Sequence, residues 1–350
     1  MVRLNSILFA LLGVGLFAFG SVSGQLNVLL KAAALLLFLP KLRSLRFSRA
    51  EIVLLTLFSG IAICQIIIQA SFTTVSLELS FFLNVILLVL IGKLDIRKSS
   101  STDRLLYIFF LLACLAQIFT FFMLTGEGML LRGDRNHSAV IITVLIFSYS
   151  YFFKHSNFTG LIILLNKSRN LALGLFAFLF RDLITTLFNT RKYLMFSILL
   201  AGLFCISYLY FFLITYLEIT NIGSENNLSR LLVIFDGSNS YRFRLNNEFV
   251  SIVLEDWQSY IINTGIYSEL IDLLGLYPHN SYLQLIYRVG ILRGFLYLFL
   301  IISLVRKHNA ALIVALVIQS MFIHDVLLSN VILLALIMSK FNVKKLKVND

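Results

Sequence analysis

The chain has 350 residues, of which 59% are hydrophobic and only 13% are charged. Soluble domains contain about 25% charged residues, so this composition excludes an ordinary soluble globular protein and predicts an all-α, polytopic membrane protein. The 29 Lys and Arg residues outnumber the 17 Asp and Glu residues and give a formal net charge of +12. In a membrane protein such a surplus of basic residues first indicates how the chain is oriented, because basic residues gather in cytoplasmic loops. Nucleic acid is therefore not an expected partner.

The apolar runs predict about twelve transmembrane helices, at roughly 20 apolar residues for each crossing of the bilayer. Residues 1–20 begin like a signal peptide but lack a small-residue cleavage site, so we expect this segment to remain as the first helix. A polar turn, Asn166–Asn170, divides the apolar run between Phe158 and Phe188 into a short seventh and a longer eighth helix. The predicted spans are 4–20, 25–40, 51–70, 73–92, 104–125, 137–153, 157–166, 170–188, 193–217, 281–304, 309–324 and 327–340.

Basic residues in the short loops orient these spans. They occur between the second and third spans, between the fourth and fifth, at later even-to-odd junctions and in the C-terminal tail: Lys41, Arg43, Arg46, Arg49, Lys93, Arg97, Lys98, Arg104, Arg191, Lys192, Arg306, Lys307, Lys344, Lys345 and Lys347. All of them fall on one side if both termini are cytoplasmic. The chain then divides into helices one to nine (1–217), one larger external loop subdomain (218–279), and helices ten to twelve with a cytoplasmic tail (280–350).

Polar groups collect on the external face in this topology. Ionisable residues at the edge of a membrane are costly to place there and are functional candidates by default. The four groups are Arg132–His137 before the sixth span, Lys167–Arg169 between the seventh and eighth, Gly237–Arg244 in the external loop, and Pro278–Tyr282 at the start of the tenth span. Their common side predicts one external site.

Arginine is the side chain best suited to a diphosphate, because its planar guanidinium keeps its charge and donates paired hydrogen bonds. Several arginines at an outer membrane edge therefore indicate an anionic headgroup as ligand. The alternative is structural: external arginines also pair with lipid phosphates and with nearby carboxylates. Among those carboxylates are Glu225, Asp236, Glu248, Glu255 and Asp256.

His279 lies at the boundary between the external loop and the tenth span. An imidazole with a pKa of about 6.5 could act there as a general base on a sugar hydroxyl. Taken alone, a histidine at a membrane edge can equally be a structural hydrogen bonder. The role of His279 therefore depends on the motif around it.

Several reaction classes lose their main support because their motifs are absent. The sequence contains no GxxxxGK[ST], GxGxxG, HExxH or GxSxG pattern, which argues against nucleotide hydrolysis, dinucleotide chemistry, zinc proteolysis and serine esterase chemistry. Cys64, Cys114 and Cys205 each lie alone in an apolar run, so neither a disulfide framework nor a cysteine metal site is expected.

The string Pro278–Leu283, followed by Gly290 and Gly294, resembles the HN-x-x-L…G-x-x-x-G signature of the superfamily of O-antigen polymerases and O-antigen ligases. Three upstream segments agree with this family in order. Residues 132–139 resemble its Gly/Asn segment before a helix, residues 167–170 its Ser-Arg turn, and residues 238–242 its loop arginine, for which Arg244 is an equally good match. Arg288 is a departure, since the family often has a Glu before the first glycine.

The resemblance implies a bacterial inner-membrane protein of GT-C-like architecture whose active site faces the periplasm. Such proteins transfer a glycan from undecaprenyl diphosphate to a sugar hydroxyl, without a nucleotide sugar and, as generally described, without a metal or other cofactor. It implies that His279, Arg242 and Arg244 are catalytic. It also implies that substrate is bound by Arg132, Arg135, Arg169, Asn280 and Tyr282.

Three functions remain open. A polymerase joins one lipid-linked glycan to another lipid-linked repeat unit, whereas a ligase transfers the glycan to lipid A-core. The short chain, its 33 Phe residues and the lack of a second large external loop favour a polymerase, with a chain-length regulator protein as a further partner. A flippase for lipid-linked oligosaccharide is the non-enzymatic alternative, but such transporters commonly show internal repeats and midplane polar sites.

Overall fold

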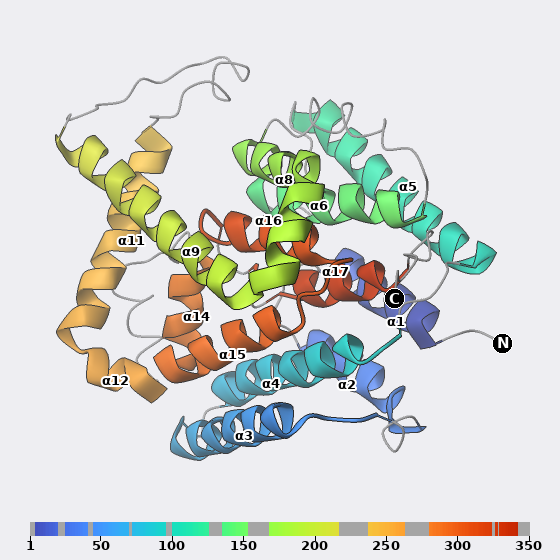
Figure 1. The fold of residues 1–350 in the computed structure, drawn as a ribbon, viewed down its shortest axis with the longest axis horizontal. Helices are drawn as coiled ribbons and strands as arrows, with labels where there is room; N and C mark the ends of the chain where they lie inside the picture. Colours follow the sequence, from blue (N-terminus) through green and yellow to red (C-terminus); the bar gives the residue numbers. More distant parts are fainter. Residues whose placement is uncertain are drawn as a thin grey trace.

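The computed structural model describes residues 4–19, 25–40, 45–69, 72–95, 100–125, 135–152, 168–216, 237–262, 280–323, 326–327 and 329–341. The regular elements in these ranges are helices (Figure 1), which confirms the all-α prediction. They are α1 (Leu4–Phe19), α2 (Gln25–Leu36), α3 (Arg49–Gln69), α4 (Phe72–Gly92), α5 (Ser101–Thr125), α6 (Arg135–Phe152), α8 (Arg169–Leu179), α9 (Arg181–Tyr216), α11 (Gly237–Glu255), α12 (Trp257–Ile262), α14 (Ser281–Val289), α15 (Ile291–Ser303), α16 (Ala310–Gln319) and α17 (Val331–Ser339). The predicted span 157–166 lies outside the described residues.

Reciprocal hydrogen bonds between side chains and backbone cap the N-termini of α3 and α5. The Ser48 hydroxyl accepts from the Glu51 backbone N–H at 3.3 Å, and the Glu51 carboxylate accepts from the Ser48 N–H at 2.7 Å. Ser100 and Asp103 repeat this reciprocal pair before α5, at 3.2 and 2.8 Å. Each pair satisfies backbone donors that a helix start leaves free, so both helices begin within a few residues of the predicted spans.

Two predicted spans are broken in the structure. The span 281–304 divides into α14 and α15 at Gly290, whose φ of 84° lies in the left-handed region that glycine adopts without strain. The span 170–188 bends by 73° between Asn170–Leu179 and Arg181–Phe188. Charged residues stand at both breaks, Arg288 and Arg293 around Gly290 and Arg181 with Asp182 at the bend. The apolar residues on either side outnumber them, so the hydropathy pattern predicts one span in each case.

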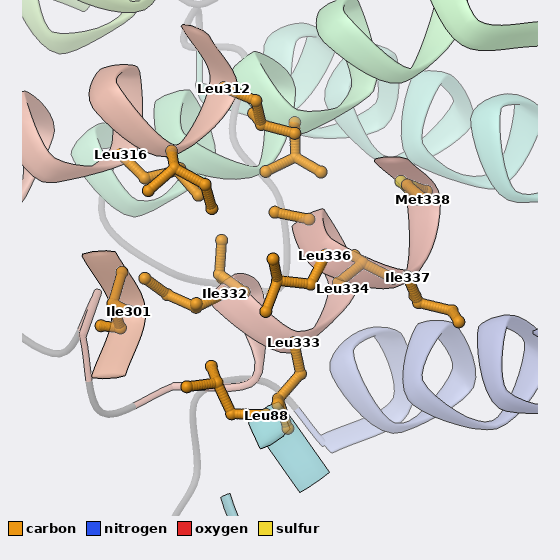
Figure 2. Close-up of a cluster of buried hydrophobic side chains, with 14 of the residues drawn as sticks. Leu88, Ile301, Leu312, Leu316, Ile332, Leu333, Leu334, Leu336, Ile337 and Met338 are labelled. Carbon is orange, nitrogen blue, oxygen red and sulfur yellow. The ribbon is translucent and has the colours of Figure 1, made fainter. Parts of the chain in front are cut away.

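The core is built around α16 and α17. All nine residues of α17 are buried, and in α16 only Ile318 is partly exposed. Figure 2 shows Leu312 and Leu316 of α16 facing Ile332 and Leu336 of α17. A helix that is apolar on every side is buried among other helices, and α17 accordingly contacts α1, α4 and α6 while α16 contacts α6, α8 and α9.

Only one described helix is both long and apolar enough to cross a bilayer by itself, Ser101–Leu124 of α5, with a mean hydropathy of 2.4. The bent pair 170–188 meets the same criteria when its two halves are counted together. Five further apolar helices in the described ranges have 10–17 residues. The prediction of about twelve spans is therefore not confirmed at that number.

The segment 218–279, predicted as an external loop, contains helical structure. Residues 237–255 form α11 and residues 257–262 form α12. These two helices lie at one side of the molecule in Figure 1, where α11 contacts α9 and both contact α14.

Candidate functional site

Four of the predicted arginines lie in helices, where the structure describes their backbone. Arg135 and Arg169 are the first residues of α6 and α8, whereas Arg242 and Arg244 lie further along α11, which begins at Gly237. Within the segment predicted as an external loop subdomain, Arg242 and Arg244 thus lie in a helix. Arg132 and His279 lie outside the described residues.

The residue that follows His279 caps α14. Asn280 is 7% exposed, and its side-chain oxygen accepts from the backbone N–H groups of Tyr282 at 2.9 Å and Leu283 at 3.2 Å. Asparagine is among the preferred N-cap residues because it satisfies donors that the first turn leaves free. The side chain of Asn280 therefore caps α14, and its predicted contact with substrate stays a prediction.

The start of α14 is fastened to residues Val317–Ile323, which we call the anchor segment. The Ser281 N–H donates to the Ser320 carbonyl at 2.8 Å, and the Ser281 hydroxyl donates to the Ile323 carbonyl at 2.5 Å. The Tyr282 hydroxyl donates to the Val317 carbonyl at 2.8 Å. The anchor segment thus accounts for the Tyr282 hydroxyl, for which we had predicted contact with substrate.

A second cluster joins the start of α8 to the start of α6. The Ser168 hydroxyl accepts from the Asn170 N–H at 3.2 Å and caps α8. The Asn136 side-chain oxygen accepts from the Ser168 hydroxyl at 3.0 Å and from the Asn170 amide at 3.1 Å. Asn136 follows Arg135, and Arg169 lies between Ser168 and Asn170, so these bonds connect two of the predicted polar groups.

The anchor segment also holds this second cluster. Gln319, which is fully buried, donates from Nε2 to the Asn170 carbonyl at 2.7 Å and to the Thr143 hydroxyl at 2.9 Å. A β-carbon added to Gly174 of α8 would lie 2.2 Å from the Thr143 hydroxyl and 2.9 Å from Gln319 Nε2. The absence of a side chain at Gly174 therefore lets α8 approach α6 and α16 closely enough for these bonds to form.

The helix that contains Arg242 and Arg244 packs on α14 through a small aromatic cluster. Leu245, Phe249, Tyr260 and Tyr287 are buried together. The Tyr287 hydroxyl donates to the Phe249 carbonyl, and the Tyr287 ring meets those of Phe249 and Tyr260 edge to face, with centroids 4.7 and 5.5 Å apart. The third predicted group is therefore connected through its helix to the fourth.

Basic residues gather at the other end of the helix bundle, away from the starts of α6, α8 and α14. Lys93, at the end of α4, pairs with Glu51 at 2.6 Å, and Lys340, after α17, donates to the Gly92 carbonyl at 3.0 Å. The Phe9 ring of α1 meets the Phe341 ring edge to face, with centroids 6.1 Å apart. The first described helix and the last, α1 and α17, thus contact each other near these basic residues, and the prediction that both termini are cytoplasmic stays a prediction.

A buried ion pair was missed by the sequence analysis. Arg293 of α15 is fully buried and donates to the Glu78 carboxylate of α4 at 2.6 Å. Its guanidinium lies 4.9 Å from the Phe58 ring centroid and 5.6 Å from that of Phe81. Glu78 and Arg293 are isolated charges in otherwise apolar runs, which is a signal for an intramembrane partner but does not identify that partner.

A third isolated charge, Lys31 of α2, is also buried. Its ammonium donates to the Ser80 hydroxyl at 2.7 Å and to the Ser80 carbonyl at 3.2 Å. These bonds, with the Arg293–Glu78 pair, join α2, α4 and α15 through polar contacts inside an apolar core. Lys31 and Glu78 are thus both buried between helices.

The hydrogen bonds described at this end of the bundle join neutral groups and fix the positions of helix starts. Three helix starts, at Arg135, Arg169 and Ser281, are joined through one network of amides, hydroxyls and carbonyls. Among the described residues no group of three or more His, Cys, Asp or Glu side chains could hold a metal ion. Arginines at fixed helix starts are suited to hold an anion in a defined position.

Comparison of this chain with protein-family models, with curated proteins and with solved structures finds no match.

Proposed function

We propose that the protein is an O-antigen polymerase, or a polymerase of a similar surface polysaccharide, in the bacterial inner membrane. It would transfer a glycan from undecaprenyl diphosphate to a sugar hydroxyl of a second lipid-linked repeat unit at the periplasmic face. This proposal includes about twelve membrane-spanning helices, cytoplasmic termini and the division at residues 217 and 279. It requires no nucleotide sugar.

Three observations support a place in the membrane. The span Ser101–Leu124 is strongly apolar, yet only 22% of its most apolar window is buried, which is the reverse of a soluble core helix. Large apolar side chains such as Phe109, Phe119 and Met123 are exposed on the same helix, and exposed apolar surface of this extent indicates a lipid or protein partner. The basic residues at the opposite ends of α4, α15 and α17 fit a cytoplasmic face.

The observation on which the proposal chiefly depends is the shared support of two motif segments. The anchor segment receives hydrogen bonds from Ser281 and Tyr282, just after His279, and Gln319 within it bonds to Asn170, just after Arg169. Residues far apart in the sequence, which resemble separate motifs of one family, thus meet on one element. If the motif segments were unrelated, the starts of α8 and α14 would have no reason to bond to the same segment.

The proposed chemistry is a displacement at the anomeric carbon of the donor sugar. The acceptor hydroxyl oxygen forms a bond to that carbon as the bond to the diphosphate oxygen breaks, and the hydroxyl proton passes to His279. Arg169 and either Arg242 or Arg244 would offset the charge that grows on the diphosphate as it leaves. Arg132 and Arg135 would add charge-assisted hydrogen bonds to the bound substrate.

The experiment that tests this function is the surface-glycan pattern of a strain from which the gene has been deleted. Lipid A-core capped by a single repeat unit is expected if a polymerase is missing. Full-length polymer retained on undecaprenyl diphosphate would instead identify a ligase. Repeat units retained in the cytoplasm would overturn both and identify a flippase.

A further inference from the structure

Two cations share one backbone acceptor at the basic end of the bundle. Lys192 Nζ donates to the Ser303 carbonyl oxygen at 3.0 Å, and Arg306 Nη1 donates to the same oxygen at 2.7 Å. Arg306 Nη1 also donates to the Val305 carbonyl at 3.1 Å. The ammonium and the guanidinium therefore approach each other around the end of α15.

The path of α9 brings Lys192 to this position. Arg191 interrupts the helix with φ −139° and ψ 53°, and the chain resumes as helix beyond it. The Tyr193 ring then stacks on Phe299 of α15, with centroids 5.3 Å apart and planes within 17°. Because the kink and the stacked rings both fix this turn, Lys192 is held beside α15 by the fold rather than by a flexible loop.

The carbonyls at this helix end balance only part of the two positive charges. A helix C-terminus bears about half of one negative charge. In the described part of the chain neither Lys192 nor Arg306 has a carboxylate within 4.0 Å, whereas nearby Lys93 has Glu51. The pKa of Lys192 is lowered by burial and then by the charge of Arg306. Lys340 interacts electrostatically with Arg306 and with Asp95, so with one carboxylate against three cations the site has an excess of positive charge.

We propose that Lys192 and Arg306 form a binding site for a phosphate group, supplied by the headgroup of an anionic membrane lipid. Two of the three ammonium hydrogens of Lys192 and the remaining guanidinium N–H groups of Arg306 would donate to the phosphate oxygens. Negative lipid surfaces attract basic segments next to a membrane, and Arg306 is exposed at the surface. This inference rests on the membrane placement in the proposed function but not on its glycan chemistry.

Thermal unfolding of the purified full chain in a neutral detergent tests the site. Micelles that contain dioleoylphosphatidylglycerol should raise the Tm by several degrees, while dioleoylphosphatidylcholine should not. The Lys192→Gln/Arg306→Gln variant should lose this rise. Lys307→Gln is the matched control, since it removes the same charge from the residue next to Arg306 and should retain the rise. An equal rise in the double variant and in the wild-type protein would overturn the proposal.

Inorganic phosphate separates the two possible sources of the ligand. A rise in Tm with millimolar inorganic phosphate, lost in the same double variant, would support the phosphate site and identify free phosphate as sufficient. If the double variant is too unstable to purify, native mass spectrometry of Lys192→Gln and Arg306→Gln singly should show fewer bound phosphatidylglycerol molecules than Lys307→Gln. Equal lipid binding in all three would contradict the site. Normal glycan ladders in these variants are expected, so the result does not depend on the polymerase assignment.

Discussion

Gln319 Nε2 donates a hydrogen bond of 2.7 Å to the carbonyl oxygen of Asn170, so the last residue of α16 is fixed to the second residue of α8. The next residue along the chain, Ser320, accepts from the N–H of Ser281 at the start of α14. One turn of backbone therefore sets the spacing between Arg169 and the residues that follow His279. This spacing is the geometric basis of the proposed site.

Replacing Gln319 should impair transfer more than it impairs folding. Gln319→Leu removes both hydrogen bonds from a buried position and leaves the Asn170 carbonyl without this donor, at a cost of about 1–3 kcal/mol. Because Arg169 then loses its fixed position, turnover of a lipid-linked substrate should fall while the amount of inserted protein stays close to normal. Chain extension in membranes, normalised to the protein present, measures this effect.

The glycines of α8 and α9 provide a matched comparison for the same contact. Gly174→Ala should disturb the approach of α8 to Thr143 and Gln319, because the new β-carbon would lie 2.2 Å from the Thr143 hydroxyl. Gly202→Ala, which meets nothing within 4 Å, should have normal activity. Equal activity in the two variants would show that close packing of α8 is dispensable.

His279→Ala should leave the protein inserted in the membrane and stop chain extension. The acceptor hydroxyl would lose the base that takes its proton, and such a base typically contributes 10²–10⁴-fold to a rate. Polysaccharide ladders from a deletion strain that expresses the variant are the measurement. Ladders of full length would show that His279 is not the base.

Arg169→Ala should lower activity by about 10²-fold or more, since it removes a proposed donor to the departing diphosphate. Arg242→Ala should do the same, unless Arg244 is the second donor, in which case Arg244→Ala should have this effect instead. Lysine should rescue poorly at either position, because an ammonium cannot reproduce the two parallel hydrogen bonds of a guanidinium. The ladders of the Ala and Lys variants, compared at equal protein levels, measure both effects. Normal ladders from both Lys variants would mean that charge alone is sufficient.

The fold was predictable where each apolar run forms one straight helix, as in α3 and α4. It was not predictable where tertiary packing decides the path: Gly290 separates α14 from α15 within what the sequence pattern predicts as one span. Similarly, Glu78 and Arg293 were visible as isolated charges, but nothing in their spacing of more than 200 residues identifies them as partners. The polar composition of residues 237–255 concealed α11, because no apolar run marks it.

Breaking the buried Glu78–Arg293 pair should destabilise the protein strongly. Glu78→Gln leaves the Arg293 guanidinium buried without its counter-charge, and removing one partner of such a pair typically costs about 3–5 kcal/mol. The double variant Glu78→Leu/Arg293→Met should recover much of this loss, because two apolar side chains avoid the desolvation of both ions. The Tm values of the three proteins in one detergent measure the effect. A double variant less stable than Glu78→Gln would contradict this view.

His308 should make the protein sensitive to mild acid. Burial, with Lys340 and Arg306 nearby, lowers the pKa of His308 from 6.5 to about 4. Between these values the unfolded chain binds a proton that the folded chain does not, so stability should be full above pH 6.5 and fall as the pH drops toward 4. The expected loss is on the order of 3 kcal/mol. His308→Leu should flatten the profile of Tm against pH over this interval.

The most direct test of the polymerase assignment is a reaction with the purified protein in lipid vesicles. Given undecaprenyl-diphosphate-linked repeat units as the sole substrate, the protein should produce glycans of increasing length and release one undecaprenyl diphosphate for each bond formed. The His279→Ala protein should do neither. If the wild-type protein moves lipid-linked units across the vesicle membrane without joining them, or joins them only when lipid A-core is added, the assignment is contradicted.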